Sequence, residues 1–133
     1  MAAVVIDTST WVEILERGHV SAAARSMVED GLVHVPPLVA AEILSGRYSP
    51  GRRRYVEEAL GQLPWCTVDR AHWFRVGAMR AELRGRGVTV STPDAHVAQC
   101  ALDLEAVLWT EDAVFALVAR HTALRLGDWR LDA

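Results

Sequence analysis

The sequence alternates short apolar runs with longer stretches of helical character along its length. This alternation is typical of βαβ units, in which parallel strands form a sheet and the intervening helices cover both faces. The expected strands cover residues 2–6, 32–35, 66–68, 107–109 and 122–126. The expected helices cover residues 10–17, 21–30, 37–46, 52–62, 70–86, 93–104 and 112–120. We therefore predict an α/β fold of three layers, with helices on both sides of a central, mostly parallel sheet of about five strands.

The length and composition are those of one ordinary soluble domain. The 133 residues are 51% hydrophobic and 23% charged, and no linker or internal repeat divides them, so residues 1–133 should form a single domain. No apolar run approaches the roughly 20 residues that span a bilayer, and the N-terminus lacks a basic leader, which predicts a cytoplasmic protein without a membrane segment. The formal net charge of -3 argues against binding nucleic acid through bulk positive charge.

The expected helix 70–86 has the clearest apolar face in the chain. Its apolar residues Trp73, Val76, Met79 and Leu83 follow one another at spacings of three, three and four. These spacings place the four side chains on one face of a helix. We expect this face to pack against the core.

Cysteine and histidine give no clear site in the sequence. Cys66 and Cys100 are the only cysteines and lie far apart, so we expect neither a disulfide framework nor a structural zinc site. His96 and Cys100 are four residues apart on an expected helix, but two ligands are too few to close a zinc site. The five histidines form no evident acid–base pair along the chain.

Acidic residues follow two of the expected strands. Ligands of open parallel sheets bind outside the carboxyl ends of the strands, so residues just after apolar runs are the first candidates for a site. Asp7 directly follows the run 2–6, and Asp112 comes three residues after the run 107–109. Both should lie at the same edge of the sheet, although either could instead cap the helix that follows it. Spacing alone leaves open whether Asp112 or its neighbour Glu111 faces the site.

Two further acids lie on apolar faces of expected helices. In the helix 93–104, Asp94 shares a face with Val97, and on another helix Glu42 follows Leu38 by four residues. Both carboxylates are therefore predicted to point inward. An acid in the first turn of a helix is also favoured by the helix dipole, which is an alternative role for Asp94 but not for Glu42.

These four acids together predict a bound cation. An ionised carboxylate that faces a core is unfavourable unless it is paired or bound to a cation, and neither helix face offers an obvious Arg. Four acids near one sheet edge would also repel one another. Carboxylates without neighbouring His or Cys suit Mg²⁺ or Mn²⁺, which bind through a few carboxylates and substrate phosphate oxygens. The residues thus indicate a metal-dependent phosphodiester hydrolase.

A basic segment follows the expected helix that carries Glu42. Residues 46–55 read Gly-Arg-Tyr-Ser-Pro-Gly-Arg-Arg-Arg-Tyr. The arginines of this segment are Arg47, Arg52, Arg53 and Arg54. Arg and Tyr side chains can bind phosphates and stack on unpaired bases, so the segment is a candidate RNA contact. A solvated turn is the alternative.

At these residues the sequence resembles the PIN-domain nucleases, and among them the VapC-type toxins of bacterial toxin–antitoxin pairs. The resemblance covers nearly the whole chain. Its motifs are DTST at 7–10, VAAEILSG at 39–46, AELRGRGV at 81–88, STPDAHVAQCA at 91–101 and LWTEDAVF at 108–115. Each motif is short, but their order and spacing together are specific to the family.

The resemblance implies a catalytic quartet of Asp7, Glu42, Asp94 and Asp112. Asp112 is preferred over Glu111 because the family pattern at this point is Thr, any residue, Asp. Family members often carry a further acid shortly after the fourth, where this chain has Ala113 and Val114. A fifth acidic ligand is therefore not expected.

The resemblance also assigns roles within the quartet. Asp7, Asp94 and Asp112 would hold Mg²⁺ or Mn²⁺, and Glu42 would either join them or orient the attacking water. The hydroxyl groups of Thr8 and Thr110 would support the acids through hydrogen bonds. Attack by a metal-activated water predicts products with a 5′-phosphate and a 3′-hydroxyl.

The family further implies a PIN-like α/β/α fold, endoribonuclease activity on structured RNA, a homodimer, and a cognate antitoxin whose C-terminal segment covers the acidic groove. A catalytically silent PIN-like module that binds RNA or protein is the alternative. Receiver domains and haloacid-type phosphatases also gather acids on a parallel α/β fold, but they use an essential Lys. All 14 basic residues of this chain are Arg, which excludes both classes.

Overall fold

A four-stranded parallel sheet forms the centre of the computed structural model, which describes residues 2–17 and 22–128. Its strands are β1 (Val4–Ile6), β2 (Val33–His34), β3 (Val107–Trp109) and β4 (Arg125–Gly127). They lie in the order β2-β1-β3-β4, and Val4 pairs with both Val33 and Val107. Strands β1 and β3 are therefore neighbours, although about a hundred residues separate them along the chain.

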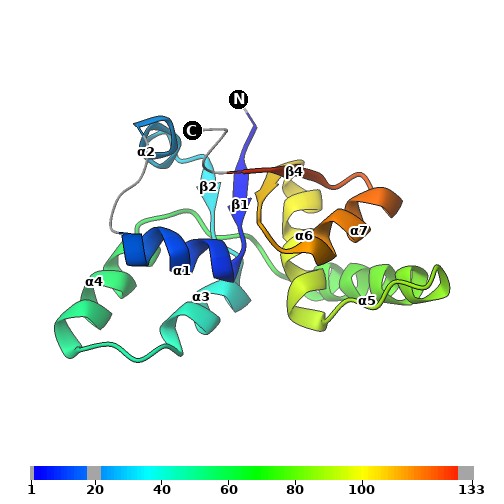
Figure 1. The fold of residues 1–133 in the computed structure, drawn as a ribbon, viewed down its shortest axis with the longest axis horizontal. Coiled ribbons are helices and arrows are strands. Elements are labelled where there is room, and N and C mark those ends of the chain that lie inside the picture. Colours follow the sequence, from blue (N-terminus) through cyan, green and yellow to red (C-terminus); the bar gives the residue numbers. More distant parts are fainter. Residues whose placement is uncertain (1, 18–21, 129–133) are drawn as a thin grey trace.

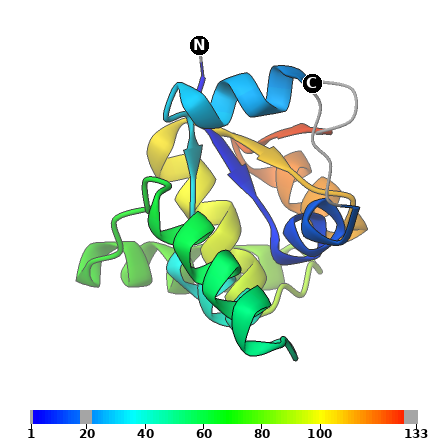
Figure 2. The same cartoon turned by 90° about the vertical axis from the view of Figure 1, so that its left-hand side faces the viewer.

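Helices flank the sheet on both sides. Those of the described chain are α1 (Thr8–Arg17), α2 (Ala22–Glu29), α3 (Pro37–Leu44), α4 (Pro50–Gly61), α5 (Arg70–Gly85), α6 (Thr92–Leu104) and α7 (Ala113–His121). Figure 1 shows α1 to α4 to the left of the central strands and α5 to α7 to their right, and Figure 2 views the molecule from the α1–α4 side. None of these helices is long and apolar enough to cross a membrane. The predicted three-layer α/β fold is confirmed.

The strand predicted at residues 66–68 is absent, so the described sheet has four strands where we expected about five. The chain pairs there only through an isolated parallel bridge between Val35 and Trp65. Val35 donates its N–H to the Pro64 carbonyl and accepts the N–H of Cys66, both over 2.9 Å. Pairing ends at this bridge because the neighbouring strand β2 is only two residues long and α3 begins at Pro37.

Helix α5 buries a slightly different face from the one predicted. Val76, Met79 and Leu83 are buried as expected, whereas Trp73 is 39% exposed. Its neighbour His72 is 0% exposed and precedes Val76 by four residues, so it is His72 that continues the buried face. An imidazole rather than an indole therefore enters the protein interior.

Helix α6 runs through the middle of the molecule. Residues 95–101 are all buried, because the helix packs against α3, α5, α7 and the strands β1 and β3. Ser91 caps its N-terminus by accepting the N–H of Asp94 over 3.2 Å, and Pro93 occupies the first turn. Asp94 thus lies where this central helix begins.

Candidate active site

Asp7 is a buried carboxylate at the end of strand β1. It is 5% exposed, and its Oδ1 accepts the N–H of Thr10 over 3.0 Å and the hydroxyl of Ser9 over 3.4 Å. Its Oδ2 accepts a short hydrogen bond from the Thr110 hydroxyl. Asp7 therefore caps the start of α1, as one alternative predicted, and is also held across the sheet by the neighbouring strand's end.

Thr110 connects the two strand ends that carry acids. Its hydroxyl donates to Asp7 and accepts the backbone N–H of Asp112 over 3.0 Å. The exposed carboxylate of Asp112 caps α7 by accepting the N–H of Val114 over 3.0 Å. Because β1 and β3 are adjacent and parallel, Asp7 and Asp112 emerge at one edge of the sheet, as predicted.

Glu42 reaches the same region from helix α3, but the prediction that its side chain points into the core is wrong. The buried residues of α3 are Val39, Ala40 and Ile43, whereas Glu42 is exposed. The Thr8 hydroxyl donates to Glu42 Oε1 over 2.8 Å, as its predicted supporting role requires. An exposed carboxylate avoids the desolvation that an inward one would suffer, so position 42 faces solvent beside the start of α1.

The other three acids act on the carboxylate of Asp94. It is half-buried, and its pKa is raised above the ordinary value, first by burial and then by the negative charges of Asp112, Glu42 and Asp7. The hydrogen bond to Ser91 opposes this shift. The four predicted acids therefore lie near enough for their charges to act on one another. Asp112, rather than Glu111, is among the carboxylates that act on Asp94.

The charge of this cluster is not balanced by basic side chains. In the part of the chain that the structure describes, the ion pairs of Arg and His join other acids and none involves Asp7, Glu42, Asp94 or Asp112. Carboxylate oxygens gathered without a basic partner fit a hard divalent cation such as Mg²⁺ or Mn²⁺. The donor set therefore suits the metal that the sequence predicts.

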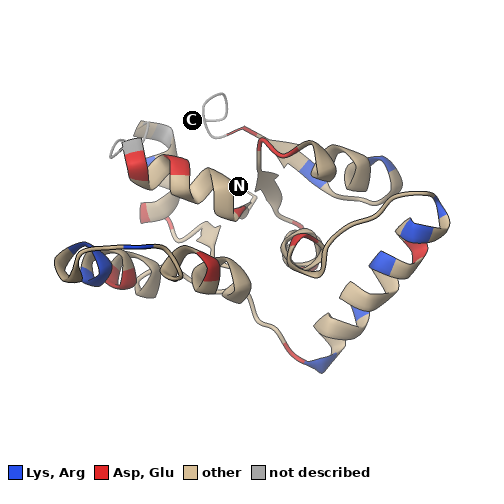
Figure 3. Ribbon diagram, turned by 60° about the horizontal axis from the view of Figure 1, so that its bottom comes forward, with Lys and Arg blue, Asp and Glu red and all other residues tan. Residues whose placement is uncertain are grey.

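The arginines of the 46–55 segment divide into two kinds. Arg52 donates to the Leu15 carbonyl over 2.9 Å, and Arg53 donates to the Leu44 carbonyl over 2.8 Å and pairs with Glu57. All four arginines are exposed, so these contacts are what distinguish Arg52 and Arg53 from Arg47 and Arg54. Figure 3 shows basic positions on α4 and on α5, toward opposite edges of the view, with α6 between them.

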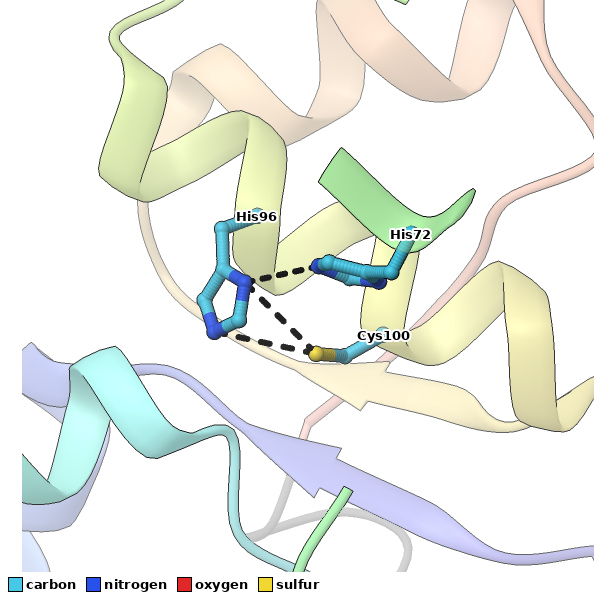
Figure 4. A group of neighbouring side chains, drawn as sticks. All are labelled: His72, His96 and Cys100. Carbon is cyan, nitrogen blue, oxygen red and sulfur yellow. Dashed lines mark hydrogen bonds between the residues drawn. The ribbon is translucent and has the colours of Figure 1, made fainter. Parts of the chain in front are cut away.

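A second group of side chains was not predicted as a site. His72 of α5 and His96 and Cys100 of α6 have ligand atoms within 4.8 Å of one another, and all three residues are buried (Figure 4). His72 Nε2 and His96 Nδ1 are 2.8 Å apart, so the structure pairs two histidines for which the sequence indicated no pair. The signal available in the sequence was that His72 precedes Val76 by four residues and so lies on the same face of α5 as the buried apolar residues.

The sequence has relatives of known name. It matches the PIN domain family over residues 4–121. It is 31% identical to a VapC ribonuclease of Mycobacterium bovis and to ribonuclease VapC11 of Mycobacterium tuberculosis, over 96% of this chain and 99% of each relative.

Solved structures share the fold. A DNA-bound VapBC from Salmonella typhimurium superposes with a TM-score of 0.78 at 21% identity, covering 97% of this chain and 99% of that chain. VapBC2 from Rickettsia felis, bound to a promoter DNA fragment, gives a TM-score of 0.78 at 19% identity, covering 96% and 98%.

Fold and site together define an α/β protein with a carboxylate-lined site at the carboxyl edge of a parallel sheet. More particularly, the chain belongs to the PIN-domain family and, within it, to the VapC group.

Proposed function

We propose that this protein is the endoribonuclease toxin of a toxin–antitoxin pair and that it hydrolyses RNA with Mg²⁺ or Mn²⁺ at the carboxylate site. Its VapC relatives, which are named ribonucleases, support the reaction class. The observation that carries the metal dependence is the charge balance. Burial and three neighbouring carboxylates disfavour the ionised form of Asp94, and no basic side chain of the described residues pairs with the cluster.

Three acids would hold the cation, and two hydroxyl groups would orient the acids. Asp7, Asp94 and Asp112 supply the oxygen ligands. Bound there, the metal would activate water and neutralise charge on the phosphate. Thr110 holds Asp7 and the backbone at Asp112 through the hydrogen bonds described above. These contacts fix the Asp7 carboxylate and the backbone of Asp112 before an ion arrives, which is the usual role of residues that surround metal ligands.

Glu42 would act on the attacking water. The Thr8 hydroxyl occupies its Oε1, so Oε2 can accept a hydrogen bond from a water at the mouth of the site. Glu42 is exposed, as a group that meets an incoming phosphate should be. A water held in this way attacks phosphorus in line and leaves a 5′-phosphate and a 3′-hydroxyl.

The alternative route through the RNA 2′-hydroxyl would need an accessible acid–base pair. His72 and His96 are paired with each other but are 0% exposed, so neither can reach a substrate. Burial and the neighbouring His72 lower the pKa of His96 to about 4, which keeps this imidazole neutral. The contacts of these histidines therefore favour water as the nucleophile over the 2′-hydroxyl.

We propose Arg47 and Arg54 as the arginines that contact the RNA backbone. All four arginines of the segment are exposed, but Arg52 and Arg53 also hold backbone carbonyls of neighbouring helices. Guanidinium groups bind phosphates in pairs of hydrogen bonds, and a few of them can guide RNA toward an acidic site. Arg52 also lies over the Tyr55 ring at 5.0 Å and would help to shape this surface.

We further propose a homodimer that is inhibited by a cognate antitoxin in the cytoplasm. The structures with this fold are described as VapBC complexes, which supports a protein partner of that kind. The partner's C-terminal segment would cover the acidic groove. The alternative, a catalytically silent module, would retain such a partner without cleaving RNA.

Mapping of RNA ends tests the activity and its metal together. Purified protein free of antitoxin is incubated with total RNA in Mg²⁺, in Mn²⁺ and in chelator, beside Asp7→Asn and the control Glu58→Gln, an exposed acid on α4. We expect metal-dependent cuts with 5′-phosphate ends, a loss of at least ~100-fold in Asp7→Asn, and full activity in Glu58→Gln. Cleavage in chelator, or 2′,3′-cyclic phosphate ends, would overturn the mechanism. Absence of cleavage in every arm would support the silent module.

A further inference from the structure

The buried group of His72, His96 and Cys100 differs chemically from the carboxylate site. His72 and His96 are 0% exposed and Cys100 is 1% exposed. His72 lies on α5, and the other two residues lie one helical turn apart on α6. Figure 4 shows the two imidazoles and the thiol facing a common point between the helices. Nitrogen and sulfur ligands of this kind suit borderline or soft cations rather than Mg²⁺.

Hydrogen bonds set the tautomer of His72. Its Nδ1 lies 3.0 Å from Asp103 Oδ2, and the guanidinium of Arg75 donates to both oxygens of Asp103. A carboxylate held in this way accepts a proton-bearing Nδ1–H, so Nε2 of neutral His72 presents its lone pair to His96 and Cys100. Histidines that bind metals usually donate their second N–H to a carboxylate in this manner.

The same logic fixes His96. The N–H of Leu38 points at His96 Nε2 over 3.5 Å, so Nε2 accepts and Nδ1 carries the proton that is donated to His72. Without an ion, the group is thus a hydrogen-bonded relay that ends on Asp103. An ion would replace the 2.8 Å contact between the rings by two nitrogen–metal bonds.

The spacing of the ligand atoms is close to that of a tetrahedral site. Bonds of about 2.0 Å to nitrogen and 2.3 Å to sulfur place neighbouring ligands roughly 3.3–3.6 Å apart. His72 Nε2 and His96 Nδ1 are 2.8 Å apart, Cys100 Sγ is 4.0 Å from His96 Nδ1, and all three ligand atoms lie within 4.8 Å of one another. Shifts of about 1 Å would therefore bring them to the spacing of a bound ion.

Cys66 is a second thiol near the group, and it lines the same pocket as Cys100. It lies outside the set whose ligand atoms are within 4.8 Å of one another, so its side chain would have to move to reach an ion. Cys66, Cys100 and Asp103 line one surface pocket together with Trp65, Asp69 and Arg75. The buried group can thus be reached from solvent along the sulfur side, through a wall that contains an acid.

We propose that His72, His96 and Cys100 form a second, thiolate-containing metal site that takes Zn²⁺ or a similar borderline cation, and that Cys66 completes it after a shift of its side chain. Binding would release one proton from each thiol, and His96 would move its remaining proton from Nδ1 to Nε2, which ends the hydrogen bond that Nε2 accepts from the Leu38 N–H. The ion would then fasten α5 to α6 and stabilise the helix that begins at Asp94. This proposal is independent of the proposed ribonuclease function.

Cobalt is the probe, because Co²⁺ bound by thiolate gives charge-transfer and intense visible bands that carboxylate-bound Co²⁺ lacks. The full chain is refolded from denaturant with Co²⁺, so that burial does not bar the ion. We expect one tightly bound Co²⁺ with thiolate bands, displaced by Zn²⁺. The bands should be lost in Cys100→Ser and kept in Asp94→Asn, which disables only the carboxylate site.

Two further variants keep the test decisive if Cys100→Ser fails to fold. Asp103→Asn leaves all ligands in place and should weaken Co²⁺ binding about 10–100-fold. Cys66→Ser should retain a band of lower intensity from one thiolate. Absence of thiolate bands in the refolded wild type, or bands that are unchanged in Asp103→Asn and Cys66→Ser, would show that the group is a hydrogen-bonded relay without a metal.

Discussion

The carboxylate site and the buried group of His72, His96 and Cys100 share helix α6, but their charges are balanced in opposite ways. At the sheet edge, four acids stand without basic partners, and the pKa of Asp94 is raised by burial and then by its neighbours. At the buried histidines, the adjoining Asp103 lies at the surface; its partial burial would raise its pKa, but hydrogen bonds from Arg75, His72 and Gln99 together lower it. The negative charge of the first site has no basic partner among the described residues and would be balanced by a bound cation. The second is satisfied by the protein itself, so it can stabilise the fold whether or not a metal is bound.

Removal of one hydroxyl group should break the first site without unfolding the protein. Thr110→Val keeps the side-chain volume but loses the hydrogen bonds to Asp7 and to the backbone of Asp112. We expect RNA cleavage to fall about 10–100-fold, with a weaker apparent affinity for Mg²⁺. Thr110→Ser should recover most of the rate. Equal rates in Thr110→Val and wild type across a Mg²⁺ titration would contradict the positioning role.

Removal of an acid from the second site should lower stability and spare activity. Asp103→Asn, in protein without added transition metal, should reduce the free energy of unfolding by about 1–2 kcal/mol at neutral pH. The folded pKa of Asp103 lies below its unfolded value, so this stabilisation exists above the unfolded pKa and is lost as pH falls through the folded pKa.

Urea unfolding at about pH 7 and about pH 3 measures the stability difference between Asp103→Asn and wild type. The control is Glu105→Gln, because Glu105 is an exposed acid just beyond helix α6. Cleavage per folded molecule should stay within about twofold of wild type. A stability difference that is as large at the lower pH would show that packing, rather than charge, carries the effect.

The matching substitution in the carboxylate site, Asp94→Asn, should change the free energy of unfolding in the opposite direction. The folded pKa of Asp94 lies above its unfolded value, so ionised Asp94 destabilises the metal-free protein, and the penalty is relieved as pH falls through the folded pKa. Asp94→Asn should therefore raise the free energy of unfolding by up to about 1 kcal/mol at neutral pH in chelator, although it removes a metal ligand. Denaturation curves in chelator and in Mg²⁺ distinguish the two effects. A less stable Asp94→Asn in chelator would mean that the carboxylate is paired in solution.

The smallest expected effect separates the arginines. Arg54→Ala should lower kcat/KM about threefold and reduce the slope of log kcat/KM against log salt by about 1, because one phosphate contact is lost. Arg53→Ala should mainly lower stability, since Arg53 holds the Leu44 carbonyl and Glu57. Identical salt slopes in Arg54→Ala and wild type would remove Arg54 from the RNA-binding surface.

The sequence predicted the four acids better than it predicted their orientation. Asp7 and Asp112 follow strands, and the topology of a parallel sheet is enough to bring such residues to one edge. Glu42 was expected inside because it follows Leu38 by one helical turn. Leu38 itself is only half-buried, and the core contacts of α3 come from Val39, Ala40 and Ile43, so helical spacing identified the wrong face.

The sequence did not predict the buried group of His72, His96 and Cys100, for a different reason. Two candidate buried faces fit helix α5, one that begins with Trp73 and one that begins with His72. Hydrophobicity favours the face that begins with the indole. The structure buries the imidazole instead because Asp103 and His96 satisfy both of its nitrogens. That compensation comes from residues more than twenty positions away, which no local pattern records.

Helix α6 presents Asp94 to one site and His96 to the other, and the two residues are only two positions apart. In an α-helix that separation is a rotation of roughly 200°, so the two side chains leave the axis in nearly opposite directions. A turn of the helix about its axis that improved one site would draw the other out of line. Insertions or deletions between positions 94 and 100 should therefore be lost from functional variants, and the phase of this helix becomes a quantity that a library of such variants can measure.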